Sequence, residues 1–183
     1  MIRRILQTAL YLASELEALV SMPNDRLTLR RLYLRVFEVK HGDPLFIGRA
    51  FRLLCPRNLT IGDRCAIGDY VKIINHVPVT IGDDFIGSAG LHIETGDHDP
   101  VTLAPKPRPV VIGNRVWCGI NVTIMAGVTI GDDVVIGVGA VVCSDIPPNS
   151  IAVGIPAKPV KRLDRTTDQQ LWTWVAPGSP LRP

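Results

Sequence analysis

Residues 111–158 read VIGNRVWCGINVTIMAGVTIGDDVVIGVGAVVCSDIPPNSIAVGIPAK, and apolar or small side chains recur in this stretch with a period of six. The first hexad position is Ile112, Cys118, Ile124, Ile130, Ile136 and Val142, and the fifth is Val116, Val122, Val128, Val134, Ala140 and Ile146. Because side chains alternate across a strand, residues four apart point to the same side, so both positions are predicted to face a core. Pairs such as Gly131-Asp132 lie between them and are interpreted as bends, since Gly and Asn tolerate positive φ.

Each hexad is therefore interpreted as one short strand and one corner. A fixed hexapeptide period is typical of a parallel β-helix, in which each coil buries its side chains against the next. A meander of ordinary strands would need a hairpin every few residues and fits the strict frame poorly. Less regular hexads extend the array over 47–153, and new frames at Ile61 and Ile81 indicate small bulges at corners. The sequence predicts an all-β fold of about five coils with three hexads in each.

Residues 95–109, TGDHDPVTLAPKPRP, interrupt the period. Four prolines fall in this segment, and proline removes a backbone donor and fixes φ, so the segment cannot continue the sheet. It is predicted to leave the stack as a protruding loop. Long ordered loops in compact domains are usually functional.

Length and charge set the bounds. The 183 residues and the net charge of +3 suit one domain with small appendages. We divide the chain into an N-terminal helical segment (1–44), a β-helix domain (45–163) and a C-terminal tail (164–183). No part of the sequence is strongly basic, so no nucleic-acid partner is expected.

The four cysteines, Cys55, Cys65, Cys118 and Cys143, form no Cys-x-x-Cys motif. Two of them fall on inward hexad positions, so a disulfide framework or a thiolate metal cluster is not expected. Unpaired thiols of this kind indicate a reducing compartment, and the predicted location is cytoplasmic.

The N-terminal region contains a basic, amphipathic stretch at 27–40, LTLRRLYLRVFEVK. One interpretation is a helix that packs on the end of the β-helix. The other is peripheral contact with a membrane surface that carries a lipid-linked substrate. The sequence leaves both open, and no stretch reaches the length of a transmembrane span.

The hexads resemble those of the left-handed β-helix acyltransferases, the hexapeptide-repeat family. The resemblance covers about 45–163 and is strongest over 95–162, where the segment DIPPNSIAVGIPAKPVKRL (145–163) is similar to the closing motif of the acetyltransferase branch. The chain looks most like maltose and galactoside O-acetyltransferases and their exopolysaccharide-modifying relatives. The resemblance implies left-handed crossovers, acetyl-CoA as co-substrate, no metal, and a homotrimer with active sites between subunits.

His98 is the candidate general base. A loop histidine beside two aspartates is, taken alone, more often surface decoration. However, Thr95-Gly96-Asp97-His98 resembles the run that carries the catalytic histidine in exopolysaccharide-modifying members of the family. His98 is expected to take the proton as the acceptor hydroxyl attacks the thioester directly. Asp97 and Asp99 are predicted to orient the imidazole and to contact the substrate.

The remaining site residues also follow from the resemblance. Asn75 and His76 lie where the sugar acetyltransferases tend to place an acceptor-binding carboxylate, so His76 either hydrogen-bonds the acceptor or caps a bulge, whereas His92 is predicted to be structural. Backbone amides near Gly119 and Ile120 are candidates for polarising the thioester carbonyl. Lys158 and Lys161 are candidates for the cofactor phosphates, with solvated surface charge as the alternative. The full predicted cofactor-binding set is Trp117, Gly119, Ile120, Val138, Ser144, Lys158 and Lys161.

The predicted function is acetyl-CoA-dependent O-acetyl transfer to a sugar or cell-surface glycan. An amino-sugar N-acetyltransferase is one alternative. A second is a metal-dependent hydratase like the carbonic anhydrases built on this helix, which would need three histidines on one metal across a subunit interface. His76, His92 and His98 are numerous enough, but their spacing does not match that family. A third alternative is a non-catalytic scaffold.

Overall fold

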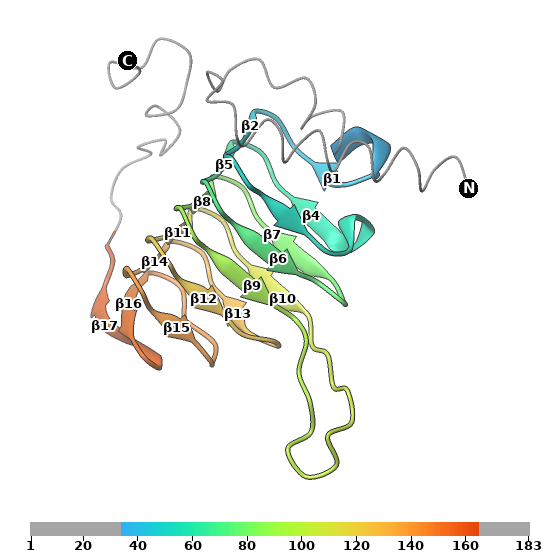
Figure 1. Ribbon diagram of the computed structural model, residues 1–183. Helices are drawn as coiled ribbons and strands as arrows, with labels where there is room; N and C mark the ends of the chain where they lie inside the picture. The colour runs from blue at the N-terminus through green and yellow to red at the C-terminus, as the bar shows by residue number, and fades with distance from the viewer. Residues whose placement is uncertain (1–33, 165–183) are drawn as a thin grey trace.

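The computed structural model describes residues 34–164, and these form a parallel β-helix with three sheets (Figure 1). Sheet A contains β1 (Lys40–His41), β4 (Leu59–Ile61), β7 (Val79–Ile81), β10 (Val110–Ile112) and β13 (Thr129–Ile130). Sheet B contains β2 (Leu45–Ile47), β5 (Cys65–Ile67), β8 (Ile86–Gly87), β11 (Trp117–Cys118), β14 (Val134–Ile136), β16 (Ser150–Gly154) and β17 (Ala157–Arg162). Sheet C contains β3 (Arg52–Leu53), β6 (Lys72–Ile74), β9 (His92–Glu94), β12 (Thr123–Ile124) and β15 (Val141–Val142). A 3-10 turn, η1, covers Pro56–Asn58.

Consecutive strands visit sheets A, B and C in turn, so three strands make one coil with an A–B, a B–C and a C–A corner. Five complete coils run from β1 to β15, and the first begins at Lys40, slightly before the predicted domain boundary. A partial sixth turn follows, in which β16 pairs with β14 and β17 returns antiparallel to β16. The all-β, stacked-coil prediction is confirmed, with one partial turn more than expected. Most of the predicted N-terminal segment and the C-terminal tail lie outside the described residues.

Coil length changes only at the C–A corner. Equivalent corner residues of successive coils, which are joined by a hydrogen bond, are 20 residues apart in the sequence in the first coils. They are 31 apart across the loop and 18 apart after it. Residues that occupy equivalent positions in the strand pairing keep a constant separation across the A–B and B–C corners. Across the C–A corner, between β3 and β4 in the first coil, five residues (54–58) separate the strands, whereas residues 125–128 separate β12 from β13 in the fourth. The frame shifts seen in the sequence are therefore small insertions at this one corner.

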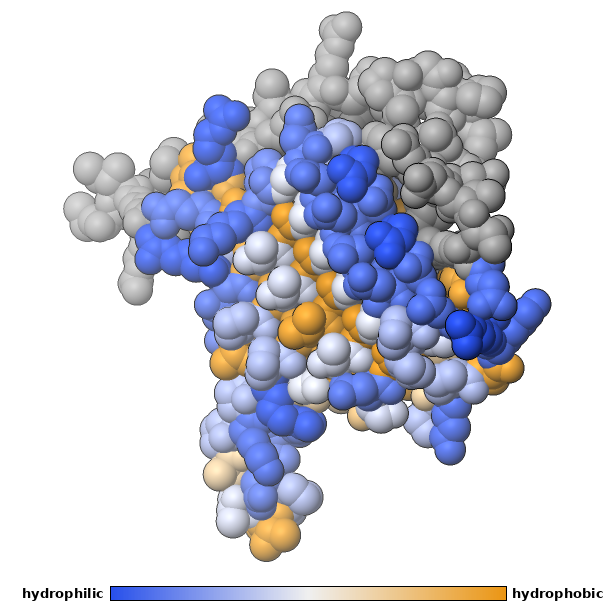
Figure 2. All heavy atoms as spheres, turned by 180° about the vertical axis from the view of Figure 1, so that it is seen from behind, coloured by the Kyte–Doolittle hydropathy of each residue, from blue (hydrophilic) through white to orange (hydrophobic). Residues whose placement is uncertain are grey.

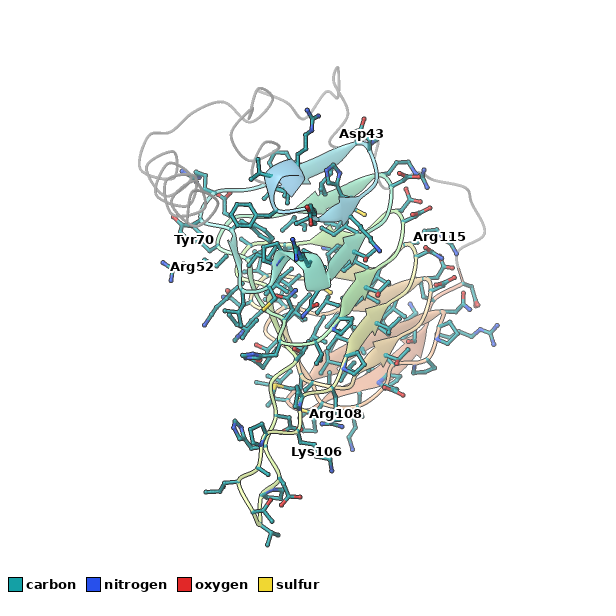
Figure 3. The ribbon with its side chains drawn as sticks, turned by 90° about the vertical axis from the view of Figure 1, so that its right-hand side faces the viewer. Asp43, Arg52, Tyr70, Lys106, Arg108 and Arg115 are labelled. Atoms are coloured by element: carbon teal, nitrogen blue, oxygen red, sulfur yellow. The ribbon has the colours of Figure 1, made fainter. Side chains whose placement is uncertain are left out.

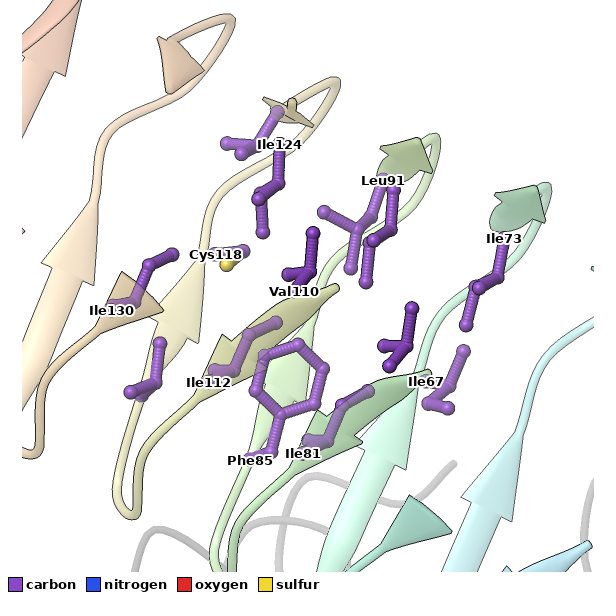
Figure 4. Close-up of a cluster of buried hydrophobic side chains, with 14 of the residues drawn as sticks. Ile67, Ile73, Ile81, Phe85, Leu91, Val110, Ile112, Cys118, Ile124 and Ile130 are labelled. Carbon is purple, nitrogen blue, oxygen red and sulfur yellow. The ribbon is translucent and has the colours of Figure 1, made fainter. Parts of the chain in front are cut away.

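The predicted inward ladder forms the core. All twelve hexad positions between 112 and 146 are buried, and none exposes more than 2% of its surface. Figure 4 shows such side chains stacked from coil to coil. Cys65 and Cys118 belong to the ladder, and burial raises the pKa of Cys65 to about 11 and that of Cys118 to about 12. Both thiols therefore behave as small apolar side chains.

Glycine at the A–B corner has a different role from the predicted one, whereas Gly90 and Gly139 at the B–C corner do have positive φ. Positive φ falls two residues after the Gly, at Arg115 and Asp133 for example, with φ values of 55° and 57°. The Gly instead allows the next coil to approach, because a Cβ on Gly82 would lie 2.5 Å from Asn114 Oδ1. That oxygen accepts the Asp83 N–H at 2.9 Å, so the interpretation of these glycines as positive-φ residues was wrong.

This corner hydrogen bond repeats along the A–B corner. Carboxylate or amide oxygens of Asp63, Asp83, Asn114 and Asp132 each accept the backbone N–H of the equivalent residue one coil earlier. Bidentate ion pairs reinforce it, with Arg64 on Asp84 and Arg115 on Asp133. Figure 3 shows Asp43 and Arg115 along this same edge.

The three outer faces differ in polarity. Sheet A carries mainly Thr in its outward row, at Thr60, Thr80 and Thr129. Sheet C carries Arg52, Lys72 and His92 in register. Sheet B carries an apolar row, which we call the sheet B row: Phe46, Ala66, Ile86, Trp117, Val135 and Ile151. Figure 2, seen from behind, shows a hydrophilic band beside a paler, more apolar strip. Within residues 34–164 no helix has the length and apolarity needed to cross a bilayer.

Phe85 and Gly87 provide a test of core packing. Phe85 is fully buried, and a Cβ on Gly87 would lie 2.9 Å from its ring and 2.7 Å from Leu91 Cδ2. We expect Gly87→Ala to lower the free energy of unfolding by about 1–3 kcal/mol through overpacking, and Phe85→Val to lower it by roughly 2–4 kcal/mol through a cavity. In urea unfolding, the double variant should cost less than the sum of the two. Strict additivity would show that the two positions do not share one space.

Candidate active site

The loop after β9 is a hairpin that protrudes from the C–A corner (Figure 1). Its two limbs are joined by backbone hydrogen bonds from Arg108 N–H to Thr95 O at 3.0 Å, from Lys106 N–H to Asp97 O at 2.7 Å and from Asp99 N–H to Ala104 O at 2.9 Å. The prolines lie outside these donor positions, so they do not interrupt the pairing. The predicted protruding loop is confirmed, and it has an ordered hydrogen-bonding pattern of its own.

Both limbs of the loop are fastened to the β-helix. The buried Thr95 donates its N–H and its hydroxyl to Ile74 O, at 3.0 and 3.2 Å, and its hydroxyl oxygen accepts the Val77 N–H. On the other limb, the Arg108 side chain covers Gly127, where a Cβ would lie 2.9 Å from Nη1. Figure 3 shows Lys106 and Arg108 on this returning limb. The loop is thus anchored to the coil before it and to the coil after it.

His98 lies on the outgoing limb, opposite Pro105, with its side chain exposed. Asp97 accepts the His98 backbone N–H at 2.8 Å and pairs with Arg108 at 2.7 Å, and both contacts lower the pKa of Asp97. Asp99 accepts the Val101 and Thr102 N–H groups and closes the tip. Neither carboxylate contacts the imidazole within the chain, which differs from the prediction that both orient it. Both carboxylates shape the loop instead.

On the predicted acceptor side, Asn75 and His76 have different settings. Asn75 is fully buried, and its amide exchanges hydrogen bonds with the Cys55 backbone at 2.9 and 2.7 Å. It therefore supports the C–A corner, with both side-chain polar atoms engaged. His76 is exposed, and its ring lies beside Gly96, since a Cβ there would be 3.3 Å from His76 Cδ2. The structure thus brings His76 to the root of the loop that carries His98.

The predicted cofactor side begins on sheet B. Trp117 exposes 45% of its surface, and its indole N–H donates to Ser88 Oγ at 3.2 Å. The Gly119 N–H donates to Ile136 O at 2.8 Å, so this amide holds two coils together and is not available to a thioester. The Ile120 N–H makes no hydrogen bond within residues 34–164, and it remains the candidate donor.

Other predicted cofactor residues are spread over the second half of the β-helix. Ile120 and Val138, which expose 49% and 74% of their surface, lie on the B–C corner of successive coils. Lys158 and Lys161 are exposed on β17, opposite Val153 and Ile151. Ser144 is exposed but lies on the C–A corner, the same corner as His98. Within one chain, the loop and the Trp117–Ile120 side are therefore separated by sheet C.

Arg108 shapes the loop that carries His98, and sequence reasoning missed it. It lies eleven residues after Asp97 in a segment without a period, so only the hairpin pairing reveals that the two side chains meet. Glu94 was missed for a similar reason, because its role depends on a contact with Gly96 at the point where the chain leaves the sheet.

The contact between Asp97 and Arg108 can be tested through the pKa of Asp97. The pKa of Asp97 lies below 3.8, so its contribution to loop stability is present above that pH and is lost as the pH falls through the lowered pKa. In Arg108→Gln we expect a carboxyl-carbon NMR titration to move the Asp97 pKa partway back toward 3.8, because the stronger cause, the His98 N–H, remains. The Asp99 pKa, lowered by the Thr102 and Val101 amides, should not move and serves as the control. An unchanged Asp97 pKa would contradict the pairing.

Comparisons with known proteins agree with this architecture. Residues 109–144 match the family model described as bacterial transferase hexapeptide (six repeats). WcaF of Escherichia coli strain K12, assigned as a colanic acid biosynthesis acetyltransferase, is 33% identical over 130 residues, which are 70% of this chain and 71% of WcaF. The galactoside O-acetyltransferase of the same strain is 35% identical over 58% of this chain and 55% of its own length.

Solved structures show the same fold. A maltose O-acetyltransferase from Clostridium difficile 630 superimposes with a TM-score of 0.77 at 28% identity, covering 89% of this chain and 87% of that one. A hexapeptide-repeat acetyltransferase from Vibrio cholerae, solved with acetyl-CoA, gives a TM-score of 0.72 at 26% identity and covers 87% and 88% of the two chains. The repeat, the stacked coils and these relatives together show that the chain belongs to the hexapeptide-repeat, left-handed β-helix acetyltransferase family.

Proposed function

We propose that this acetyltransferase moves the acetyl group of acetyl-CoA to a hydroxyl of a sugar or of a cell-surface glycan. The donor follows from the family, whose Vibrio cholerae member was solved with acetyl-CoA. The acceptor class is supported by relatives assigned to colanic acid biosynthesis and to galactoside O-acetylation. The observation that carries the proposal is the anchored hairpin, which holds an exposed histidine away from the β-helix with no hydrogen bond to its imidazole within residues 34–164.

In this mechanism His98 is the general base. The imidazole takes the proton of the acceptor hydroxyl as its oxygen attacks the thioester carbonyl. The Ile120 N–H stabilises the resulting oxyanion, and collapse of the tetrahedral intermediate releases the coenzyme A thiolate, which takes the proton back from the imidazolium. Cys65 and Cys118 lie in the core, and burial raises the pKa of both thiols, so neither is proposed as a covalent acyl carrier.

The site is completed by a second subunit in this proposal. His98 projects from the C–A corner, whereas Trp117, Ile120 and Val138 lie on sheet B and the B–C corner, so one chain does not bring them together. A closed homotrimer would set the loop of one subunit against the cofactor corner of the next. Lys158 and Lys161, at the end of the β-helix, are then placed for the cofactor phosphates.

The alternatives are weighed against the same observations. An amino-sugar acceptor would use the same base and cofactor, and the acetylated product distinguishes the two. A hydratase would need three histidines that converge on one metal across a subunit interface, whereas relatives solved with acetyl-CoA or coenzyme A support the transferase. We also propose a cytoplasmic location, supported by four cysteines that form no disulfide.

The base is tested by His98→Ala. We expect a loss of acetyl transfer of at least about a hundredfold, measured as release of coenzyme A thiol with a panel of galactosides, maltose and acidic glycan fragments. Calorimetry should give unchanged acetyl-CoA binding near one site per chain. His41→Ala, an exposed histidine on β1 far from the loop, is the matched control and should keep full activity. Near-normal turnover of His98→Ala would overturn the assignment of the base.

The shared site is tested by subunit mixing. His98→Ala lacks the base, and Val138→Trp fills the cofactor corner at a position that is 74% exposed and tolerant of a larger side chain. Each variant alone should be inactive. Trimers formed from equal amounts of both, after unfolding and refolding together, should recover about a quarter of wild-type activity, because one interface in four then pairs an intact loop with an intact corner. No recovery from correctly assembled trimers would place each site within one subunit.

A further inference from the structure

Glu94 is a carboxylate in a row of uncharged side chains on the outer face of sheet C. Ile74 lies beside it one coil earlier, and Met125 occupies the same place one coil later, after Ile124, which pairs with Ile93. Only 24% of the Glu94 side chain is exposed. The neighbours of Glu94 along its row are apolar, while Lys72 and His92 occupy the adjacent row of the same face. A carboxylate that is mostly covered is unfavourable unless it is hydrogen-bonded or paired, so its partners indicate why it is there.

The hydrogen-bond partner of the Glu94 side chain is a backbone N–H at the start of the loop. Oε1 accepts the backbone N–H of Gly96 at 2.7 Å. Oε2 lies 3.8 Å from His92 Nε2, which is too far for a hydrogen bond, and this buried nitrogen has no partner within residues 34–164. Burial and the charge of Lys72 lower the pKa of His92, so the ring is neutral near pH 7 and is not a strong ion-pair partner. The hydrogen bond from the Gly96 N–H is therefore the main interaction of the Glu94 carboxylate.

Gly96 is the point at which the chain leaves the β-helix. Thr95 is still hydrogen-bonded to the previous coil through Ile74, whereas Asp97, the residue after Gly96, pairs with the returning limb. A Cβ on Gly96 would lie 2.8 Å from Glu94 Oε1 and 3.3 Å from His76 Cδ2, so the Gly96 backbone is packed between these two side chains. The orientation of this peptide sets the direction of the outgoing limb and hence the position of His98, two residues later.

We propose that Glu94 is a positioning residue that fixes the Gly96 peptide and so sets the direction in which the loop presents His98. The proposal rests on the proposed function, because it takes His98 as the base. Glu94 acts through the loop backbone and does not contact the reacting atoms. What it contributes is the acceptor oxygen for the Gly96 N–H, and a glutamine side chain offers an equivalent oxygen in the same place.

The test compares Glu94→Ala with Glu94→Gln in the full chain. Using the best acceptor from the sugar panel, or acetyl-CoA hydrolysis if no sugar is acetylated, Glu94→Ala should lower kcat on the order of ten- to a hundredfold, because small displacements of a catalytic group cost that much. Glu94→Gln should stay within about threefold of wild type, because the Gly96 hydrogen bond is retained. The acceptor KM, the acetyl-CoA Kd and Tm should be unchanged in both. Leu54→Ala, in the same row two coils away, is the packing control.

A second measurement does not depend on activity. Amide hydrogen exchange at Gly96 and His98 should be at least about tenfold faster in Glu94→Ala than in wild type or Glu94→Gln, with exchange in β6 and β12 unaltered. If the wild-type chain shows no acetyl transfer, the proposed function fails while this measurement still decides the role of Glu94. Unchanged exchange or unchanged kcat in Glu94→Ala would overturn the proposal. So would a loss in Glu94→Gln equal to that in Glu94→Ala, or a rise confined to the acceptor KM, which would make Glu94 an acceptor contact.

Discussion

The structure depends on the hydrogen bond that a corner side chain accepts from the backbone one coil earlier. In a parallel β-helix the strands satisfy their backbone groups through the sheets, but each corner turns the chain out of sheet geometry and leaves N–H groups without a ladder partner. At the A–B corner, Asp63, Asp83, Asn114 and Asp132 supply the missing acceptors. Asp69 does the same for Arg49 at the B–C corner. Glycine follows from this requirement, because any side chain at the preceding position would collide with the incoming oxygen.

A rigid stack of this kind determines where chemistry can be placed. Inward positions are closed by aliphatic packing, and backbone groups along the strands are already engaged, as the Gly119 amide shows. Functional groups must therefore come from corners and from outward rows. His98 is supplied by a hairpin that Thr95 and Arg108 fasten to the two neighbouring coils, so the loop gains reach without losing a fixed position. The separation of this loop from Trp117 explains why a partner subunit is part of the proposed site.

The sequence predicted the features that repeat with the six-residue period. It failed for single contacts that do not repeat. All twelve ladder positions are buried, because a six-residue repeat reports directly which side chains point inward. The four prolines located the loop, because proline has no N–H to donate to the parallel ladder and cannot continue a central strand. The repeat does not report what an amide or a carboxylate bonds to. The roles given to the A–B corner glycines, to Asp97 and to the Gly119 N–H were therefore wrong or incomplete, and Arg108 and Glu94 were missed.

The uneven length of the C–A corner has a consequence for how such a chain can diverge. Two corners keep a constant length, while the third holds the small insertions of the first coils and the long hairpin after β9. An insertion there lengthens one coil without shifting the register of any strand. After the long hairpin, for example, β10 pairs with β7 in register, with Val110 opposite Val79. The C–A corner is therefore the place in the β-helix that tolerates insertions. New segments can be gained or exchanged at it while the core stays as it is, so specificity can change faster than the fold.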